Sequence, residues 1–269
     1  MSGMALKGKR ALVSGSVQGI GLAIATELAR SGADVVLHGL PHPDAHAAAQ
    51  AAIEAVSGRR PQSLAHDLAD SAAVEAMMAE ALEGGALDIL VNNAGIQHTA
   101  ALVEMPREKW DAILAINLSA AFDTMRLALP GMMQRGYGRI INIASVHGLV
   151  ASVNKAPYVA AKFGLVGLTR VAALEAAQAG SRASGGVTAN CICPGWTETA
   201  IIEPQIQARA SLFGGDRDAG IRDLLKEKQP SGRTSTPEEI ARTVLWLCDP
   251  AAHNLTGAAI PIDGGWTAQ

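Results

Sequence analysis

Short apolar runs alternate along this chain with longer segments in which apolar residues recur every three or four positions. A short apolar run is typical of a buried strand, whereas the longer spacing is typical of a helix with one buried face. Because helical segments separate the apolar runs, we predict an α/β protein with a mostly parallel sheet covered by helices on both faces. The expected strands are residues 9–13, 34–37, 87–91, 139–143, 187–192 and 258–262.

The length of the chain and the lack of a linker indicate its domain organisation. A chain of 269 residues could form two domains, but α/β folds of this size are often a single domain. No stretch resembles a linker between independent halves, and no internal repeat is visible. We therefore expect one domain over residues 1–269.

Charge and hydropathy exclude several kinds of partner. The net charge is −3 and the lysines and arginines form no cluster, so the sequence lacks the footprint of a nucleic-acid-binding protein. No apolar run approaches the ~20 residues that a membrane span requires, so no membrane association is expected. The N-terminus also lacks the apolar core of a signal peptide.

The three cysteines do not indicate a metal site or a set of disulfides. Cys191 and Cys193 lie in or beside an expected strand, and Cys248 lies near an expected helix end. No histidine pattern supports the Cys-x-Cys pair as metal ligands, so buried small apolar residues are the favoured interpretation. Free thiols suit a reducing compartment. We expect a cytoplasmic protein without a metal.

A glycine-rich turn joins the first expected strand to the first expected helix. Gly15, Gly19 and Gly21 have the spacing G-x-x-x-G-x-G, between the strand 9–13 and the helical segment 22–29. Such a turn lets the backbone approach a pyrophosphate at the positive end of the helix. A tight turn without a ligand is the alternative, but the flanking elements favour dinucleotide binding.

Ser145, Tyr158 and Lys162 carry the proton chemistry that the sequence suggests. Tyr158 and Lys162 are four residues apart on an expected helix, so their side chains share a face. A free phenol, with a pKa of about 10, is a poor base at neutral pH, and a nearby ammonium is expected to lower that pKa. A serine hydroxyl can bind the same substrate oxygen. The trio suits proton transfer at an alcohol or carbonyl oxygen, although a Tyr-Lys pair alone also occurs by chance in ordinary helices.

Together with the Asn-Asn-Ala-Gly turn at 92–95 and the Pro-Gly pair at 194–195, these motifs resemble the short-chain dehydrogenase/reductase family over nearly the whole chain. The resemblance implies a Rossmann-like, doubly wound parallel sheet of about seven strands, with Asp67 at the end of the third. It also implies a catalytic tetrad of Asn117, Ser145, Tyr158 and Lys162.

The resemblance further implies which residues contact a dinucleotide. Asp67 would contact the adenine, Lys162 would contact the nicotinamide ribose, and Asn117 would support Lys162 through a water and a local helix distortion. Ser14 is one departure, because the family usually has threonine there, but the hydroxyl is kept. The implied cofactor-binding residues are Gly15, Ser16, Gly19, Ile20, Gly21, Asp67, Leu68, Asn93, Ala94, Gly95, Tyr158, Lys162, Pro194, Gly195, Thr197 and Thr199.

The end of the second strand bears on the choice of dinucleotide. In such folds a carboxylate about 20 residues after the glycine-rich turn selects NAD. Residues 38–41 contain no acid, but they also contain no arginine or lysine to neutralise the 2′-phosphate of NADP. His38 and His42 are weak cations at neutral pH, and an unpaired phosphate is costly to desolvate. We therefore expect NAD.

Four residues near the catalytic positions indicate a site for a small anion. Three of them are expected in loops at the carboxyl ends of strands, where ligands bind in such sheets, and the fourth follows the Pro-Gly loop. Amide, imidazole and ammonium groups around one point can bind a carboxylate. Each also has a plain alternative, such as a solvated surface charge for the lysine. The four residues are Gln97, His147, Lys155 and Gln205.

Five strings of the sequence resemble one subgroup of the family, the bacterial D-3-hydroxybutyrate dehydrogenases; they lie at 92–102, 108–119, 141–152, 226–230 and 263–268. This resemblance implies that the four residues above hold a substrate carboxylate and that Trp196 and Trp266 wall the pocket. The implied function is NAD-dependent interconversion of D-3-hydroxybutyrate, or a closely related short 3-hydroxy acid, and acetoacetate. Tyr158 would be the general base and acid.

Two segments depart from that subgroup. Residues 179–186 resemble an insertion in a surface loop, which should be tolerated. Residues 212–220 fall in an expected substrate lid at about 199–228. The family also implies a homotetramer, in which helices at 108–135 and 158–179 would pair across subunits.

Two other functions remain as alternatives. One is the reduction of another 3-oxo substrate, such as a 3-oxoacyl thioester, although a large thioester would fit poorly into an anion pocket closed by two tryptophans. The other is a non-catalytic dinucleotide-binding regulator, which would not need a complete proton-transfer tetrad.

Overall fold

In the computed structural model, which describes residues 5–200 and 202–268, the strands form a single parallel sheet. The strands are β1 (Arg10–Val13), β2 (Asp34–Gly39), β3 (Gln62–Ala65), β4 (Ile89–Asn92), β5 (Tyr137–Ile143), β6 (Gly186–Pro194) and β7 (Ala259–Ile262). Their order is β3-β2-β1-β4-β5-β6-β7. The order reverses between β1 and β4, and the crevice at the carboxyl ends of those strands is where such sheets bind ligands.

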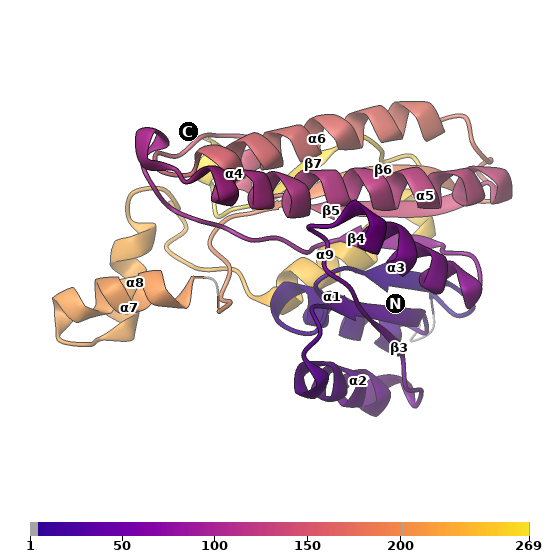
Figure 1. Cartoon of the computed structure of the whole chain (residues 1–269), viewed down its shortest axis with the longest axis horizontal. Helices are drawn as coiled ribbons and strands as arrows, with labels where there is room; N and C mark the ends of the chain where they lie inside the picture. The colour runs from indigo at the N-terminus through magenta and orange to yellow at the C-terminus, as the bar shows by residue number, and fades with distance from the viewer. Residues whose placement is uncertain (1–4, 201, 269) are drawn as a thin grey trace.

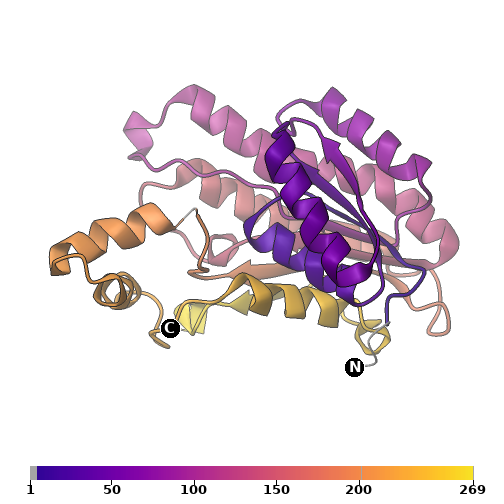
Figure 2. The same ribbon diagram turned by 90° about the horizontal axis from the view of Figure 1, so that it is seen from below.

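Helices cover both faces of the sheet (Figures 1 and 2). One face carries α1 (Gly19–Arg30), α2 (Pro43–Ser57) and α9 (Pro237–Leu247), and the other carries α3 (Ser71–Glu83), α4 (Arg107–Leu114), α5 (Ala120–Arg135) and α6 (Ala156–Ala176). Two further helices, α7 (Glu203–Ala210) and α8 (Arg217–Leu225), pack on each other and project beyond the sheet (Figure 1). Short 3₁₀ turns lie at Leu102–Glu104, Val146–Gly148, Ser211–Phe213, Pro250–Ala252 and Trp266–Ala268.

The apolar pattern that predicts the strands also builds the core. Every residue of β1 and β4 is buried, as expected for strands covered on both faces. Ile24 of α1 packs in the cluster on one face, and Met77 of α3 and Met125 of α5 pack in the cluster on the other. The predicted doubly wound α/β fold is confirmed, and the strand ends expected from apolar runs lie within two residues of the observed ones.

Helices α4 and α5 form one continuous helical segment through a π-helical turn at Ala115–Ser119. By length and composition alone, Arg107–Arg135 would suffice to cross a membrane. Uninterrupted apolar runs, the only signal considered in the sequence, do not identify this segment. Its inner face, with Met125, Ala128 and Met132, is buried in the core and packs against α3 and β5. The apolar character of this inner face is therefore explained by its place in the domain.

A buried chain of hydrogen bonds fixes α5 and α6 on the sheet. Asn92 of β4 donates to Asn142 Oδ1 of β5 (2.8 Å), and Asn142 donates to Thr169 Oγ1 of α6 (2.7 Å). Thr124 of α5 donates to Asn92 Oδ1 (2.7 Å). Each buried polar group left without a partner would cost about 1–3 kcal/mol, so the four side chains favour one placement of these helices.

Residues 179–186 form a surface turn at the amino ends of β5 and β6, away from the crevice. The Ser184 hydroxyl donates to the Gly136 carbonyl (2.7 Å). Arg139, which is fully buried, donates to the carbonyls of Gly186 (3.0 Å) and Gly185 (3.1 Å). The turn is thus anchored on the edge of the sheet opposite the strand ends that carry the candidate site.

Candidate active site

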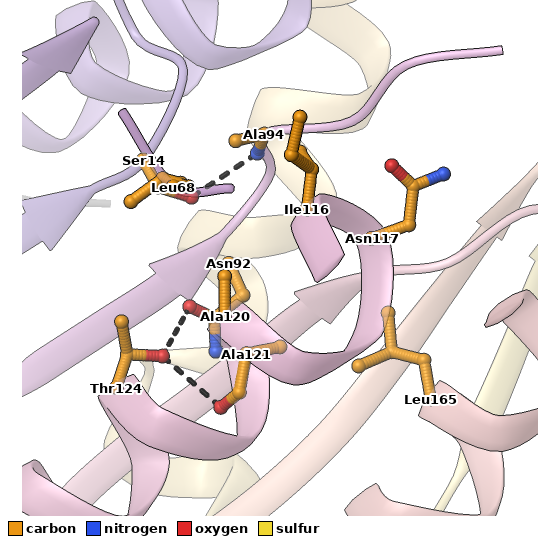
Figure 3. Close-up of a pocket in the computed structure, with 10 residues that line it drawn as sticks. All are labelled: Ser14, Leu68, Asn92, Ala94, Ile116, Asn117, Ala120, Ala121, Thr124 and Leu165. Carbon is orange, nitrogen blue, oxygen red and sulfur yellow. Dashed lines mark hydrogen bonds between the residues drawn. The ribbon is translucent and has the colours of Figure 1, made fainter. Parts of the chain in front are cut away.

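The glycine-rich turn is held against the loop that follows β4. Ser14 Oγ accepts hydrogen bonds from the backbone N–H groups of Asn93 (3.0 Å) and Ala94 (3.1 Å; Figure 3). The Asn93 side-chain amide donates to the carbonyl oxygens of Ser14 and Gly15, both at 3.0 Å. The Ser14 hydroxyl and the Asn93 amide therefore both connect the glycine-rich turn to the loop after β4 and fix its conformation.

The backbone of the turn is suited to a pyrophosphate. Gly15 and Gly19 have φ angles of +61° and +55°, which favour glycine. A Cβ atom at Gly21 would clash with the Gly15 carbonyl, so the turn packs tightly only with glycine there. The N-terminus of α1 receives no side-chain cap within the described residues, and its first N–H groups are therefore available to phosphate oxygens. These features fit a dinucleotide.

His38 links the glycine-rich turn to the loop after β3, a role that sequence analysis missed. Its Nδ1 accepts a hydrogen bond from Gly15 N (3.1 Å), and its Nε2 donates to the His66 carbonyl (3.0 Å). Burial lowers the pKa of His38 to about 4. The ring is therefore neutral at pH 7, which removes one of the two weak cations considered for a 2′-phosphate.

The other predicted cofactor residues occupy the same crevice in different ways. Asp67 is exposed, and its carboxylate accepts a hydrogen bond from Ala69 N (2.9 Å). The Ser16 hydroxyl is buried and accepts from the β2 backbone (2.9 Å). Thr199 lies against the turn, since a Cβ at Gly19 would meet its methyl group at 3.9 Å. The remaining residues lie in the first turn of α1 or on strand ends and loops that border the crevice: Ile20, Leu68, Gly95, Pro194, Gly195 and Thr197.

Ser145, Tyr158 and Lys162 meet between the end of β5 and the first turns of α6. Ser145 follows β5, and its hydroxyl lies beside the Tyr158 phenol. Lys162 Nζ donates to the Ile143 carbonyl (2.8 Å) and lies 5.6 Å from the centre of the Tyr158 ring. The structure thus brings the predicted proton-transfer residues together.

Burial dominates the charge states of these residues. It raises the pKa of Tyr158, and the Ser145 hydroxyl opposes that shift. Burial lowers the pKa of Lys162 to about 8. The expectation that Lys162 lowers the pKa of the phenol is wrong for this structure. The physical reason is that desolvation has the largest effect on the phenol, and the Lys162 ammonium, which is bound to the Ile143 carbonyl, is not among the groups that shift this pKa.

Asn117 lies in the π-helical turn and joins it to the loop after β4. Its Oδ1 accepts from Ile96 N and its Nδ2 donates to the Ile96 carbonyl, both at 2.9 Å. A Cβ at Gly95 would lie 3.4 Å from Asn117 Oδ1 and 3.7 Å from Lys162 Nζ. The π turn is a local helix distortion of the kind expected, and such turns are frequent at functional sites. The water-mediated link to Lys162 stays a prediction.

His147, Lys155, Trp196 and Trp266 form a cluster beside Tyr158. The His147 ring is perpendicular to the Trp266 ring at 5.5 Å and to the Tyr158 ring at 6.0 Å. The Trp196 and Trp266 rings stack at 6.1 Å. Lys155 Nζ lies 3.5 Å from His147 Nε2 and 5.4 Å from the centre of the Trp196 ring. These are four of the six residues predicted to bind substrate.

The hydrogen bonds of His147 define its role in this cluster. A lysine ammonium can only donate, so His147 Nε2 accepts from Lys155, and Nδ1 donates to the Val150 carbonyl at 3.3 Å. Burial, followed by the charges of Lys155 and Lys228, lowers the pKa of His147 to about 4. His147 is therefore neutral at pH 7 and orients Lys155, which supplies the positive charge.

Lys228 also belongs to the cluster, although the sequence indicated only that its string, 226–230, resembles the subgroup and assigned the lysine no role. Its Nζ lies 5.4 Å from the centre of the Trp266 ring and donates to Ser152 Oγ at 2.9 Å. Gln97 and Gln205 are half-buried. Within residues 5–200 and 202–268, neither glutamine side chain hydrogen-bonds to the cluster, so their contact with substrate stays a prediction.

Trp196 offers a further donor. Its indole N–H is buried and has no hydrogen-bond partner in the described part of the chain. Its backbone N–H donates to Gln229 Oε1 (3.1 Å), which fixes the residue in place. An unpaired buried donor costs about 1–3 kcal/mol, so this N–H group is available to an oxygen atom of a ligand.

A separate small cavity lies beneath the glycine-rich turn, among Ser14, Asn92 and Thr124 (Figure 3). Thr124 spans it with hydrogen bonds to Asn92 Oδ1 (2.7 Å) and to the Ala121 carbonyl (3.1 Å). The space is only about large enough for one water molecule. It is therefore distinct from the cluster around Lys155, where a substrate would bind.

Comparisons with known proteins agree with this geometry. A family model described as enoyl-(acyl carrier protein) reductase matches residues 15–267. A D-beta-hydroxybutyrate dehydrogenase of Cupriavidus necator is 51% identical over 98% of this chain and 100% of its own length. A second, from Rhizobium meliloti, is 43% identical over 97% of this chain and 99% of its own. A crystal structure from Agrobacterium tumefaciens, described as a 2-deoxy-D-gluconate 3-dehydrogenase with bound NADP, matches with a TM-score of 0.84 and 34% identity over 100% of both chains.

Proposed function

Because this chain belongs to the short-chain dehydrogenase/reductase family, we propose that it is an NAD-dependent dehydrogenase of D-3-hydroxybutyrate or a closely related short 3-hydroxy acid. The observation that carries the proposal is a cluster in which His147 contacts both the Lys155 ammonium and the ring of the catalytic Tyr158. A short acid with its carboxylate on Lys155 would reach Tyr158 and Ser145 with its hydroxyl.

The residues of this chain then have separate tasks. Lys155 holds the carboxylate, which lowers the entropic cost of aligning the reacting carbon. Tyr158 takes the hydroxyl proton while Ser145 holds the same oxygen, and in the reverse direction Tyr158 returns the proton to the ketone. Lys162 places a positive charge beneath the phenol. The bound NAD supplies the chemistry of hydride acceptance.

The preference for NAD rests on the residues at the end of β2. His38 is neutral and its ring nitrogens are occupied by Gly15 and His66. Residues 38–41 contain no lysine or arginine. A 2′-phosphate would therefore meet no strong cation in this segment, and its desolvation would be costly.

The pocket disfavours the alternative substrate, a 3-oxoacyl thioester. Trp266 is buried and stacks on Trp196 next to the two lysines of the cluster. A small carboxylate compensates these charges, whereas a neutral thioester does not. The complete tetrad likewise argues against a regulator without catalytic activity.

The proposal is tested by the absorbance of reduced nicotinamide, with each enantiomer of 3-hydroxybutyrate and with NAD or NADP. We expect turnover of the D form with NAD. Turnover with NADP alone would overturn the choice of cofactor. If NAD binds but neither enantiomer reacts, hydroxybutyrate is discarded as the substrate.

We propose that α7 and α8 act as a substrate lid, since they project beyond the sheet (Figure 1). The residue Lys228, which follows α8, links them to the cluster through Ser152 and Trp266. NAD with acetoacetate, a pair that cannot react together, is expected to slow tryptic cleavage at Arg209 and Arg222 by closing this segment. Cleavage at Arg182, on the distant surface turn, is the control and should not change. Equal cleavage at Arg209 with and without the two ligands would contradict a lid.

We propose that the protein is a homotetramer in which α5 and α6 pair across subunits. The two helices lie side by side (Figure 1). They expose large apolar side chains: Phe122 is 48%, Phe163 43% and Leu174 78% exposed. Sedimentation should give about four times the mass of one chain, and Leu174→Glu should lower it. A monomer in the unaltered protein would contradict the assembly.

A further inference from the structure

We infer that Lys228 is a second residue that recognises the substrate carboxylate, and that with Lys155 it makes the enzyme select acids over neutral alcohols. The inference deepens the proposed function and rests on it. Lys228 lies at the end of the segment that carries α7 and α8, far from Lys155 in the sequence. Only the folded structure brings the two ammonium groups to one cluster of side chains.

The geometry connects Lys228 to the cluster through Trp266, whereas Lys155 is connected through His147 and Trp196. Lys228 Nζ lies 5.4 Å from the centre of the Trp266 ring, and the same ring packs at 5.5 Å against His147. Lys155 Nζ lies 3.5 Å from His147 Nε2. His147 and Trp266 therefore link the two cations, and the His147 ring also contacts the Tyr158 ring at 6.0 Å.

The charges in this pocket are unbalanced. Lys228 lowers the pKa of Lys155, after the larger effect of burial, and both lysines lower the pKa of His147. In the described residues, the only charged groups that shift either pKa are lysines. Two half-buried ammonium groups without a carboxylate between them repel each other. A bound carboxylate would relieve this repulsion, and a neutral alcohol would not.

The surroundings of Lys228 hold it in this position. The backbone N–H groups of Lys228 (3.1 Å) and Gln229 (2.8 Å) both donate to the Leu225 carbonyl. Gln229 is buried and accepts a hydrogen bond from the backbone of Trp196. The Lys228 ammonium also donates to Ser152 Oγ (2.9 Å), in the loop between His147 and Lys155. Lys228 could therefore promote substrate binding by its charge, or by connecting this loop to the lid through Ser152. Two different variants are needed to distinguish these roles.

The test compares D-3-hydroxybutyrate with its methyl ester, which has the same hydroxyl group but no charge. Lys228→Met is expected to lower kcat/KM for the acid by about tenfold or more, mainly through KM, and to leave the ester within about twofold. Lys226→Met is the matched control, because Lys226 is exposed two residues earlier, and it should not change either substrate. Ser152→Ala removes the tie but keeps the ammonium, so it should retain the preference for the acid.

Two results would overturn the inference: an equal loss for acid and ester in Lys228→Met, or the same loss of acid preference in Ser152→Ala. If the unaltered enzyme does not oxidise 3-hydroxybutyrate, the proposed function fails separately. Lys228 is then tested with acetate, titrated into the NAD complex and followed by tryptophan fluorescence. Lys228→Met should weaken acetate about tenfold and Lys226→Met should not; equal affinity in both variants would exclude Lys228 as an anion-binding residue.

Discussion

Replacing Tyr158 with phenylalanine is expected to lower kcat by about 10²–10⁴-fold while NAD binding is kept. The change removes only the phenolic hydroxyl, so the ring remains packed at 6.0 Å from His147. Ser145 lies beside that hydroxyl, and the Lys162 ammonium is bound to the Ile143 carbonyl and is not free to act as the base. Steady-state kinetics measures the loss, and calorimetric titration with NAD checks that the cofactor still binds.

Tyr137→Phe is the matched control, because the sequence contains only two tyrosines. Tyr137 begins β5, where its ring packs under Lys9 at 3.4 Å and near Arg139 at 4.7 Å, at the opposite end of the strand from Ser145. Its loss should leave kcat unchanged within about twofold, since it removes no group that can reach the substrate. Wild-type turnover by Tyr158→Phe would refute the assignment of the general base.

The assignment of Tyr158 as general base and acid also predicts how the rate in each direction changes with pH. Burial raises the pKa of Tyr158, so the phenolate is the minor form at neutral pH. Oxidation needs the phenolate and should become faster as the pH rises, whereas reduction needs the protonated phenol and should become slower. Any residual activity of Tyr158→Phe should lack this dependence.

The fold and the Tyr158–Lys162 pair could be predicted because their signals are local, whereas Asn117 was implied only by the family resemblance. The strand 10–13, the glycine-rich turn and α1 follow one another in the sequence, and each has its own pattern. Tyr158 and Lys162 share one helix, so their spacing alone places both on one face. His147 and Lys155 follow β5 closely, and the carboxyl end of that strand had to border the crevice.

His38 and Lys228 could not be predicted because their roles depend on contacts between distant segments. His38 was considered as a weak cation, and only its burial against Gly15 and His66 shows that it is neutral. Lys228 stands in a polar segment without strand or helix periodicity, and its partner Ser152 is 76 positions earlier. The direction of the Tyr158 pKa shift also depends on burial, which a residue spacing does not specify.

Replacing Lys155 with alanine is expected to weaken binding of the acid by about 2–5 kcal/mol, the range for stripping a partner from a buried charge. This corresponds to a rise in KM of roughly 30-fold or more. Lys155 stands at the start of α6, so its ammonium points from a fixed helix end to His147 and Trp196. Kinetics with D-3-hydroxybutyrate and its methyl ester measures the effect. An equal loss of kcat/KM for the ester would mean that Lys155 does not recognise the carboxylate of the substrate.

The loss in Lys155→Ala should also become smaller at acidic pH. In the unaltered protein, burial first and then Lys155 and Lys228 lower the pKa of His147 to about 4. Without Lys155, His147 Nε2 loses its donor and the pKa of the ring moves back toward its ordinary value. Below that pKa the imidazolium carries the charge that the lysine supplied, and it faces the same carboxylate. Burial remains in the variant and is the largest cause of the shift, so the pKa of the ring returns only part of the way. A defect of constant size down to about pH 4 would show that His147 does not replace Lys155, and that the neutral ring serves only to orient it.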